Sequence, residues 1–224
     1  MRMSAKQIGP LTGILFVALV VVAFIVGGET PGTDDSVQKV VSFYTDNDNE
    51  QMIAAVLLAL GCTAYLFFLG TLRQVLRRLP GDEGGLSTVM LLGGLMQVAG
   101  LSLFAGLTFT LGDAADEISG TATQAIHALN NDLFFPMAVG TAVFNLALGL
   151  AVLRHGGLPR WIGWVALLIG IVSLTPLGFF GFLADGILIV VISVLLTRAA
   201  GAAPDGGAPA TASPGTAGSG PGPA

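Results

Sequence analysis

The chain has 224 residues, of which 53% are hydrophobic and 10% are charged, and its mean hydropathy is +0.81. So apolar a composition excludes a soluble globular domain and indicates a membrane protein. The formal net charge of −5 and the pI near 4.7 exclude nucleic acid as a partner, because contact with its phosphates requires a basic surface.

Six apolar runs are each long enough to cross a hydrocarbon core about 30 Å thick, which takes roughly 20 helical residues. These runs are apolar on every face, whereas the strands of a membrane β-barrel alternate apolar and polar residues. The sequence therefore predicts an all-α fold, a polytopic membrane bundle of six transmembrane helices within residues 1–198. The predicted spans are residues 10–26, 51–72, 87–111, 133–153, 159–175 and 179–197.

A short amphipathic helix is predicted between the first two spans. Apolar residues recur there at the helical spacing of three and four, after a cap formed by Asp34, Asp35 and Ser36. The helix should lie on the outer membrane surface or over the mouth of the bundle. The residues with this spacing are Val37, Val40, Val41 and Tyr44.

Asp46, Asp48 and Glu50 are the candidate acidic site on the outer face, because they alternate like the first ligands of a calcium loop. The rest of that motif is missing, since Gln51 stands where the loop needs a glycine. A helix start is therefore favoured over ion binding. In that interpretation Asn47 or Asp48 is the N-cap, and Glu50 or Gln51 reaches back to a free backbone amide.

The second outer loop, residues 112–132, is predicted to contain another helix that packs through an apolar face. Asn131 or Asp132 is then expected to cap the span at 133–153. The residues spaced for the apolar face are Ile118, Ala122, Ala125, Ile126 and Leu129.

Basic residues set the predicted orientation, because Lys and Arg are retained on the cytoplasmic side during insertion. Six spans place all of them on one side except Lys39, and they place most carboxylates on the other. Both termini are therefore expected in the cytoplasm. The tail at 199–224 is almost wholly Ala, Gly, Pro, Ser and Thr, which predicts a disordered cytoplasmic extension.

Gln97, Asn145 and Asp185 are the candidate intramembrane polar residues, since such groups are costly in lipid and commonly functional. The two amides are interpreted as partners in interhelical hydrogen bonds, each contributing about 0.6 to 2 kcal/mol. Asp185 is expected either to cap the sixth span at the outer interface or to bind a proton or a cation.

No catalytic, cofactor-binding or metal-binding residues are predicted. His127 and His155 fall on opposite sides of the predicted membrane, so they cannot bind one metal or one haem. Cys62 is alone in the chain, which excludes a cysteine cluster. The chain is therefore not expected to be an enzyme.

The hairpin "LALGLAVLRHGGLPRWIGWVALLIGIVSL" resembles a pattern of uncharacterised six-span integral membrane proteins from GC-rich bacteria. That resemblance implies a topology and transfers no activity. The first functional hypothesis is a non-catalytic accessory or interaction protein of a bacterial plasma membrane. Its partners would be the lipid bilayer and either another protein or a second copy of the chain. The alternative is a small solute or ion transporter, or a channel-like protein, with a polar path near Asp185, Asn145 and Gln97.

Overall fold

The computed structural model describes residues 5–81 and 84–202, and these residues form helices joined by loops, without a strand. The all-α fold expected from the sequence is therefore confirmed for this part of the chain. The helices are α1 (Ala5–Gly27), α2 (Val37–Asp46), α3 (Asp48–Arg77), α4 (Gly85–Ala114), α5 (Gly120–Asp132), α6 (Phe134–His155), α7 (Arg160–Ser173) and α8 (Gly178–Ala202).

Five segments of the described chain are long and apolar enough to cross a membrane, one fewer than the six predicted spans. α7 coincides with the span predicted at 159–175, but its 14 residues extend only about 21 Å. Pro176 favours this early end, because a proline disfavours helical geometry at the residue before it. The five segments are Ile8–Gly27, Asp48–Arg77, Gly85–Ala114, Gly120–His155 and Gly178–Gly201.

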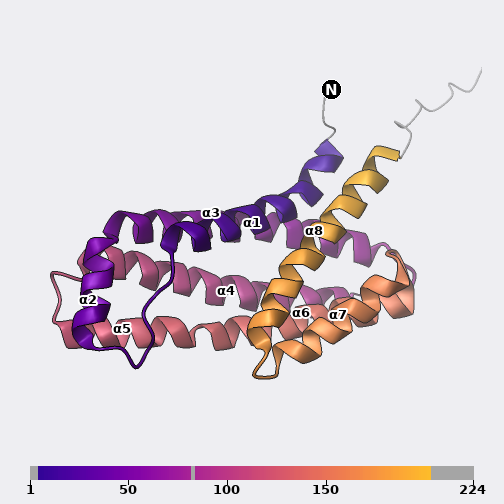
Figure 1. The fold of residues 1–224 in the computed structure, drawn as a ribbon. Coiled ribbons are helices and arrows are strands. Elements are labelled where there is room, and N and C mark those ends of the chain that lie inside the picture. The colour runs from indigo at the N-terminus through magenta and orange to yellow at the C-terminus, as the bar shows by residue number, and fades with distance from the viewer. Residues whose placement is uncertain (1–4, 82–83, 203–224) are drawn as a thin grey trace, which may run out of the picture.

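Figure 1 shows α3, α4 and the α5–α6 pair lying side by side along the long axis of the bundle, with α1 packed on α3. The chain turns back from α6 into α7. α8 then runs obliquely from the α7–α8 turn to the end of the bundle where α1 begins, and it packs against α1, α6 and α7. Ala5 and Ala202 therefore lie at the same end of the bundle.

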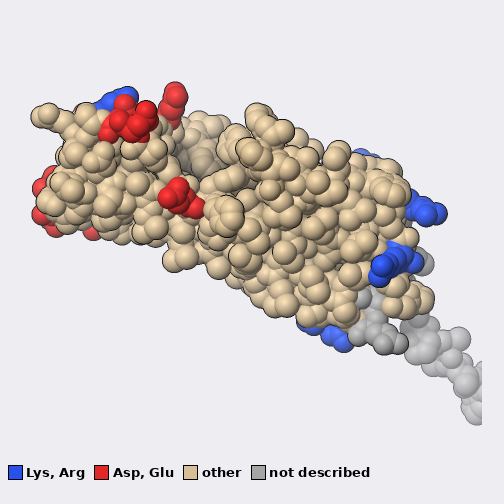
Figure 2. All heavy atoms as spheres, turned by 90° about the horizontal axis from the view of Figure 1, so that it is seen from below, with Lys and Arg blue, Asp and Glu red and all other residues tan. Residues whose placement is uncertain are grey.

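Charged side chains gather at the two ends of this bundle (Figure 2). The described carboxylates other than that of Asp185 lie, together with Lys39, at the end that carries α2 and α5, which we call the acidic end. The opposite end is the basic end, and α1 begins and α8 finishes there. Its arginines are Arg73, Arg77, Arg78, Arg154, Arg160 and Arg198.

α2 and α5 cover the acidic ends of the long helices. Val40 and Tyr44 of α2 are buried against Leu111 and Ala115 at the end of α4. The Ser36 side chain accepts a backbone hydrogen bond at 3.4 Å from the first turn of α2. The short amphipathic helix predicted here is therefore confirmed, and it lies over the end of the bundle.

The capping bonds predicted for the start of α3 are wrong. Asn47 occupies the N-cap position without a side-chain cap bond, and its Nδ2 instead donates to the carbonyl of Phe43 at 2.8 Å. The reason is that Asn47 alone separates α2 from α3, so its side chain satisfies a carbonyl at the end of α2. Gln51 Nε2 reaches across to the carbonyl of Gly27, at 2.7 Å, and so ties α3 to the end of α1.

The apolar face predicted for α5 is only partly correct. Ile126 packs against the buried cluster of Val40, Tyr44, Leu111 and Ala115. Leu129 is 54% exposed, because the inward face of α5 is polar and hydrogen-bonded to the neighbouring backbone and side chains. Thr123 Oγ1 donates to the carbonyl of Ala115 at 3.4 Å, and Asn130 Nδ2 donates to Thr108 Oγ1 at 3.1 Å. The buried side chains of α5 are Thr123, His127 and Asn130.

Neither Asn131 nor Asp132 caps α6, contrary to prediction. α6 follows α5 after the single residue Leu133 and has no side-chain cap bond. The Leu133 amide donates to the carbonyl of Leu129 at 3.2 Å, so carbonyls of α5 bond to amides at the junction and less capping is needed.

The predicted tail begins too early, because residues 199–202 continue α8. Three of these four residues are alanine, the residue with the highest helix propensity. The remaining part of the predicted tail, residues 203–224, lies outside the described residues, as does Arg2.

α4 and α6 approach most closely where two glycines face the opposite backbone. A methyl group on Gly140 would lie 2.5 Å from the backbone nitrogen of Gln97, and one on Gly93 would overlap the backbone nitrogen of Phe144. Small residues of this kind allow membrane helices to pack backbone to backbone. This close crossing holds the middle of α4 beside the middle of α6.

Candidate functional site

Four polar side chains from four helices meet in the apolar part of the bundle. Gln97 Nε2 of α4 donates to Asp185 Oδ2 of α8 at 3.0 Å, and Asn145 Nδ2 of α6 donates to Asp185 Oδ1 at 2.7 Å. Tyr65 of α3 adds a bond from its hydroxyl to Gln97 Oε1, at 3.0 Å. All four side chains are buried, and each residue is at most 1% exposed. We call them the polar cluster.

The sequence singles out three members of this cluster, and the structure brings those three together. The interhelical hydrogen bonds expected of Gln97 and Asn145 are present, and both end on Asp185. An interfacial cap is the wrong interpretation of Asp185, because its carboxylate accepts bonds from two other helices. Tyr65 was missed, although a buried tyrosine hydroxyl usually needs a hydrogen-bond partner, and this need was the available signal.

The polar cluster lies near the middle of the bundle's apolar length. Tyr65, Gln97 and Asn145 lie about 15 to 18 Å along their helices from the basic end, at about 1.5 Å per residue. Asp185 lies about 20 Å along α8 from Arg198. Half of a hydrocarbon core about 30 Å thick is about 15 Å. A membrane that begins at the arginines would therefore have the cluster close to its midplane.

The cluster brings one acidic group together with neutral partners. A carboxylate offers about four lone-pair positions, and the amides of Gln97 and Asn145 fill two of them. Within residues 5–81 and 84–202 a single salt bridge forms, between Lys39 and Asp35 at 2.7 Å. Asp185 therefore has no salt-bridge partner among these residues. Asn145 Oδ1 is also buried without a hydrogen-bond partner. The cluster thus retains hydrogen-bonding capacity and an acidic group without a counter-ion.

A groove between α1 and α8 lies beside the cluster. Its volume is about 470 Å³, which is within the usual range for small-molecule sites. Its walls are apolar, and Gln97 and Asp185 are the polar residues among those that line it, with side chains almost fully covered. Val21 and Ile187 line its rim and are 51% and 68% exposed. The groove therefore opens sideways, on the surface that a membrane would cover with lipid.

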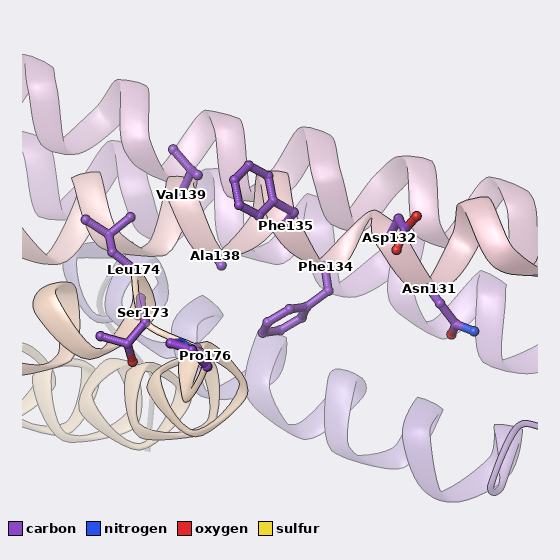
Figure 3. A pocket seen from close by; sticks show the side chains of 11 residues that line it. Asn131, Asp132, Phe134, Phe135, Ala138, Val139, Ser173, Leu174 and Pro176 are labelled. Atoms are coloured by element: carbon purple, nitrogen blue, oxygen red, sulfur yellow. The ribbon is translucent and has the colours of Figure 1, made fainter. Parts of the chain in front are cut away.

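A second cavity, of about 370 Å³, lies between the start of α6 and the α7–α8 turn. In Figure 3 the ring of Phe134 extends toward this turn, whereas Phe135 extends to the opposite side of α6. Asn131 and Asp132 lie farther along the chain axis, toward the acidic end. Asp132 is the carboxylate among its lining residues, and it is exposed.

Asp46, Asp48 and Glu50 do not form a site in the structure. Asp48 Oδ1 accepts from the backbone and side-chain nitrogens of Asn49, at 2.6 and 2.9 Å. Asp46 is the last residue of α2, and it lines a hollow between α2 and the loop of residues 29–35 that neither Asp48 nor Glu50 lines. Among the described residues no three His, Cys, Asp or Glu side chains are close enough together to hold a metal ion.

His127 links three segments at the acidic end. Its Nδ1 lies 2.9 Å from the Tyr44 hydroxyl, and its Nε2 lies 3.1 Å from the carbonyl of Pro31. A ring protonated on Nε2 fits both contacts, since it donates to Pro31 and accepts from Tyr44. The histidine therefore joins α5 to α2 and to the loop of residues 28–36.

Alkaline pH is expected to destabilise this contact through Tyr44. Burial raises the pKa of its phenol from 10.0 to about 12. The unfolded chain therefore loses this proton first, and the stability due to Tyr44 is complete below about pH 10 and falls as the pH rises toward 12. Unfolding temperatures measured from about pH 8 to 12 should decrease, and Tyr44→Phe should reduce this decrease. An identical decrease in the variant would contradict this assignment.

A scan against protein-family models, a search of curated proteins and a search of solved structures found no match to this chain.

Proposed function

We propose that this chain is a non-catalytic, multi-pass integral protein of a bacterial plasma membrane that binds a small lipid-soluble solute in the α1–α8 groove. One observation carries this proposal. A buried carboxylate, bonded to amides of two other helices, belongs to a residue that lines a groove opening sideways. Ionisable groups inside membranes are costly and usually serve a function.

The geometry favours a solute-handling protein over an accessory or interaction protein. An accessory protein needs a surface for its partner, but it does not need a carboxylate near the bilayer midplane. The channel-like alternative is less favoured, because the four side chains of the polar cluster are at most 1% exposed. The solute is proposed to enter from the lipid.

The test is thermal unfolding of the purified chain in detergent with a panel of lipid-soluble compounds. A ligand at 100 times its dissociation constant stabilises a protein by about 2.7 kcal/mol, which raises the unfolding temperature by several degrees. Gly186→Leu should abolish the shift by filling the groove, since an added methyl at Gly186 meets only Val17, at 3.9 Å. Gly106→Leu is the matched control, because Gly106 is exposed and faces open space.

A panel without any stabilising compound would reject the proposed function. The same holds for a thermal shift that persists in full in Gly186→Leu, because the compound would then bind outside the groove.

We also propose that the basic end faces the cytoplasm, with both termini inside. This arrangement follows the retention of Arg and Lys on the cytoplasmic side. The sixth crossing would be α7, whose short length leaves the α7–α8 turn within the outer leaflet. Leu174 and Phe180 support this depth, because they flank the turn and are 60% and 63% exposed, as suits side chains in lipid.

Single cysteines in a Cys62→Ala background are expected to report this topology. Cys62 is the chain's one cysteine and is buried. A membrane-impermeant maleimide should label Asp116→Cys in intact cells and Arg160→Cys only after permeabilisation, while Thr175→Cys should react weakly in both. Labelling of Arg160→Cys alone in intact cells would reverse the orientation, and strong labelling of Thr175→Cys would place the turn in water.

A further inference from the structure

Given the binding function proposed above, we infer that the solute is a lipid-soluble organic cation, held in the α1–α8 groove by the negative charge of Asp185. The groove combines apolar walls with one acidic residue, Asp185, whose carboxylate lies covered beside it. This pairing matches a molecule with an apolar body and a single positive charge.

Charge complementarity selects the cation. The residues that line the groove include Asp185 and no Lys, Arg or His. The hydrogen-bond partners of the carboxylate are neutral amides, so its negative charge has no counter-ion there. Coulomb attraction is strong in surroundings of low polarity. A cation would therefore be attracted to the groove, an anion would be repelled, and a neutral molecule would gain nothing from Asp185.

The backbone of α8 leaves room for the charge to approach. Gly186 follows Asp185 directly, and the space beside its Cα is free apart from the Val17 side chain, which a methyl group would meet at 3.9 Å. The carboxylate itself is shielded, since Asp185 is 1% exposed. A cation whose charge is surrounded by apolar groups does not need direct contact, because Coulomb attraction acts over several ångströms.

Aromatic rings add to the preference for a cation. Phe16 and Phe182 line the groove from α1 and α8. Phe16 is stacked on Tyr65 of the polar cluster, with ring centroids 4.3 Å apart and an interplanar angle of 17°. The faces of aromatic rings attract cations. These rings therefore favour the same class of solute as Asp185 does.

A lipid acyl chain is the competing occupant, because the groove opens toward lipid. An acyl chain would fill the apolar walls, but it would leave Asp185 without a role. Charge dependence therefore separates the two occupants, and the experiment should measure it directly.

The experiment compares two probes of the same shape and opposite charge, tetraphenylphosphonium and tetraphenylborate. Their binding to the full-length purified chain is measured by equilibrium dialysis in a neutral detergent. We expect saturable binding of tetraphenylphosphonium, with tetraphenylborate at least ten times weaker. Asp185→Asn should weaken phosphonium binding at least tenfold and should not weaken borate binding. Asp132→Asn, which removes a carboxylate outside the groove, should change neither.

Gly186→Leu keeps the carboxylate and fills the groove, so it should also weaken phosphonium binding at least tenfold. It provides a second test if Asp185→Asn fails to fold, which gel filtration would reveal. Equal binding of both probes, with no effect of Asp185→Asn, would overturn the cation while the binding function stands. If neither probe binds but neutral compounds still raise the unfolding temperature, the cation is likewise overturned. If no compound binds at all, the proposed function fails too.

Discussion

Gly93→Ala is expected to destabilise the folded bundle by about 3 kcal/mol, at the upper end of the usual effects of overpacking. The added methyl would overlap the backbone nitrogen of Phe144 and lie 2.9 Å from its Cα. Backbone atoms cannot move aside as a flexible side chain can, so α4 and α6 would have to separate. Their separation would also pull Gln97 away from Asp185. The loss should appear as a lower unfolding temperature in detergent.

Gly106→Ala on the same helix is the matched control for Gly93→Ala. Gly106 faces open space, so its methyl group meets nothing, and alanine is the better helix former by up to about 1 kcal/mol. The two substitutions should therefore change stability in opposite directions. Equal effects would show that helix propensity decides the outcome and that the close crossing does not.

Asn145→Leu is expected to cost about 2 to 3 kcal/mol, which is the range for hydrogen bonds to charged groups. It removes the donor that lies 2.7 Å from Asp185 Oδ1 and leaves that oxygen buried without a bond. The loss is measurable as a change in the free energy of unfolding in mixed micelles.

A double-mutant cycle shows whether the loss comes from the carboxylate. In the Asn145→Leu/Asp185→Leu chain part of the lost stability should return, because the oxygen that Asn145 leaves unpaired is removed as well. The return is partial, since Gln97 Nε2 then loses its acceptor on Asp185. Strictly additive losses would contradict this coupling. Recovery would also mean that the bundle folds without its buried acid.

The long helices could be predicted from the sequence because uninterrupted apolar runs have few alternatives in a membrane. The polar elements could not, since their partners come from distant parts of the chain. α5 buries His127, whose partners belong to α2 and to the loop of residues 28–36, and a search for apolar periodicity selects a neighbouring face, on which Leu129 is exposed. Gln51 likewise looks like a helix cap in sequence, and only the position of α1 shows that it reaches Gly27.

The candidate site was predictable residue by residue but not as an arrangement. Polar side chains within apolar runs identify Gln97, Asn145 and Asp185. These three residues meet because α4 and α6 cross at two glycines and because α8 runs obliquely. Neither of these arrangements can be predicted from the residue spacing within a single helix. Counting from the outer end of a predicted span placed Asp185 near an interface, whereas its partners lie at the middle of α4 and α6.

In the membrane arrangement proposed above, the short α7 has a consequence for the surrounding bilayer. Lipid beside α3 or α4 meets an apolar wall of full height, whereas lipid beside α7 meets one about 9 Å shorter than a hydrocarbon core of about 30 Å. The resulting hydrophobic mismatch costs fractions of a kcal/mol for each ångström and thins the bilayer locally. One flank of the molecule thus senses membrane thickness while the other does not, and thinner bilayers should favour this protein.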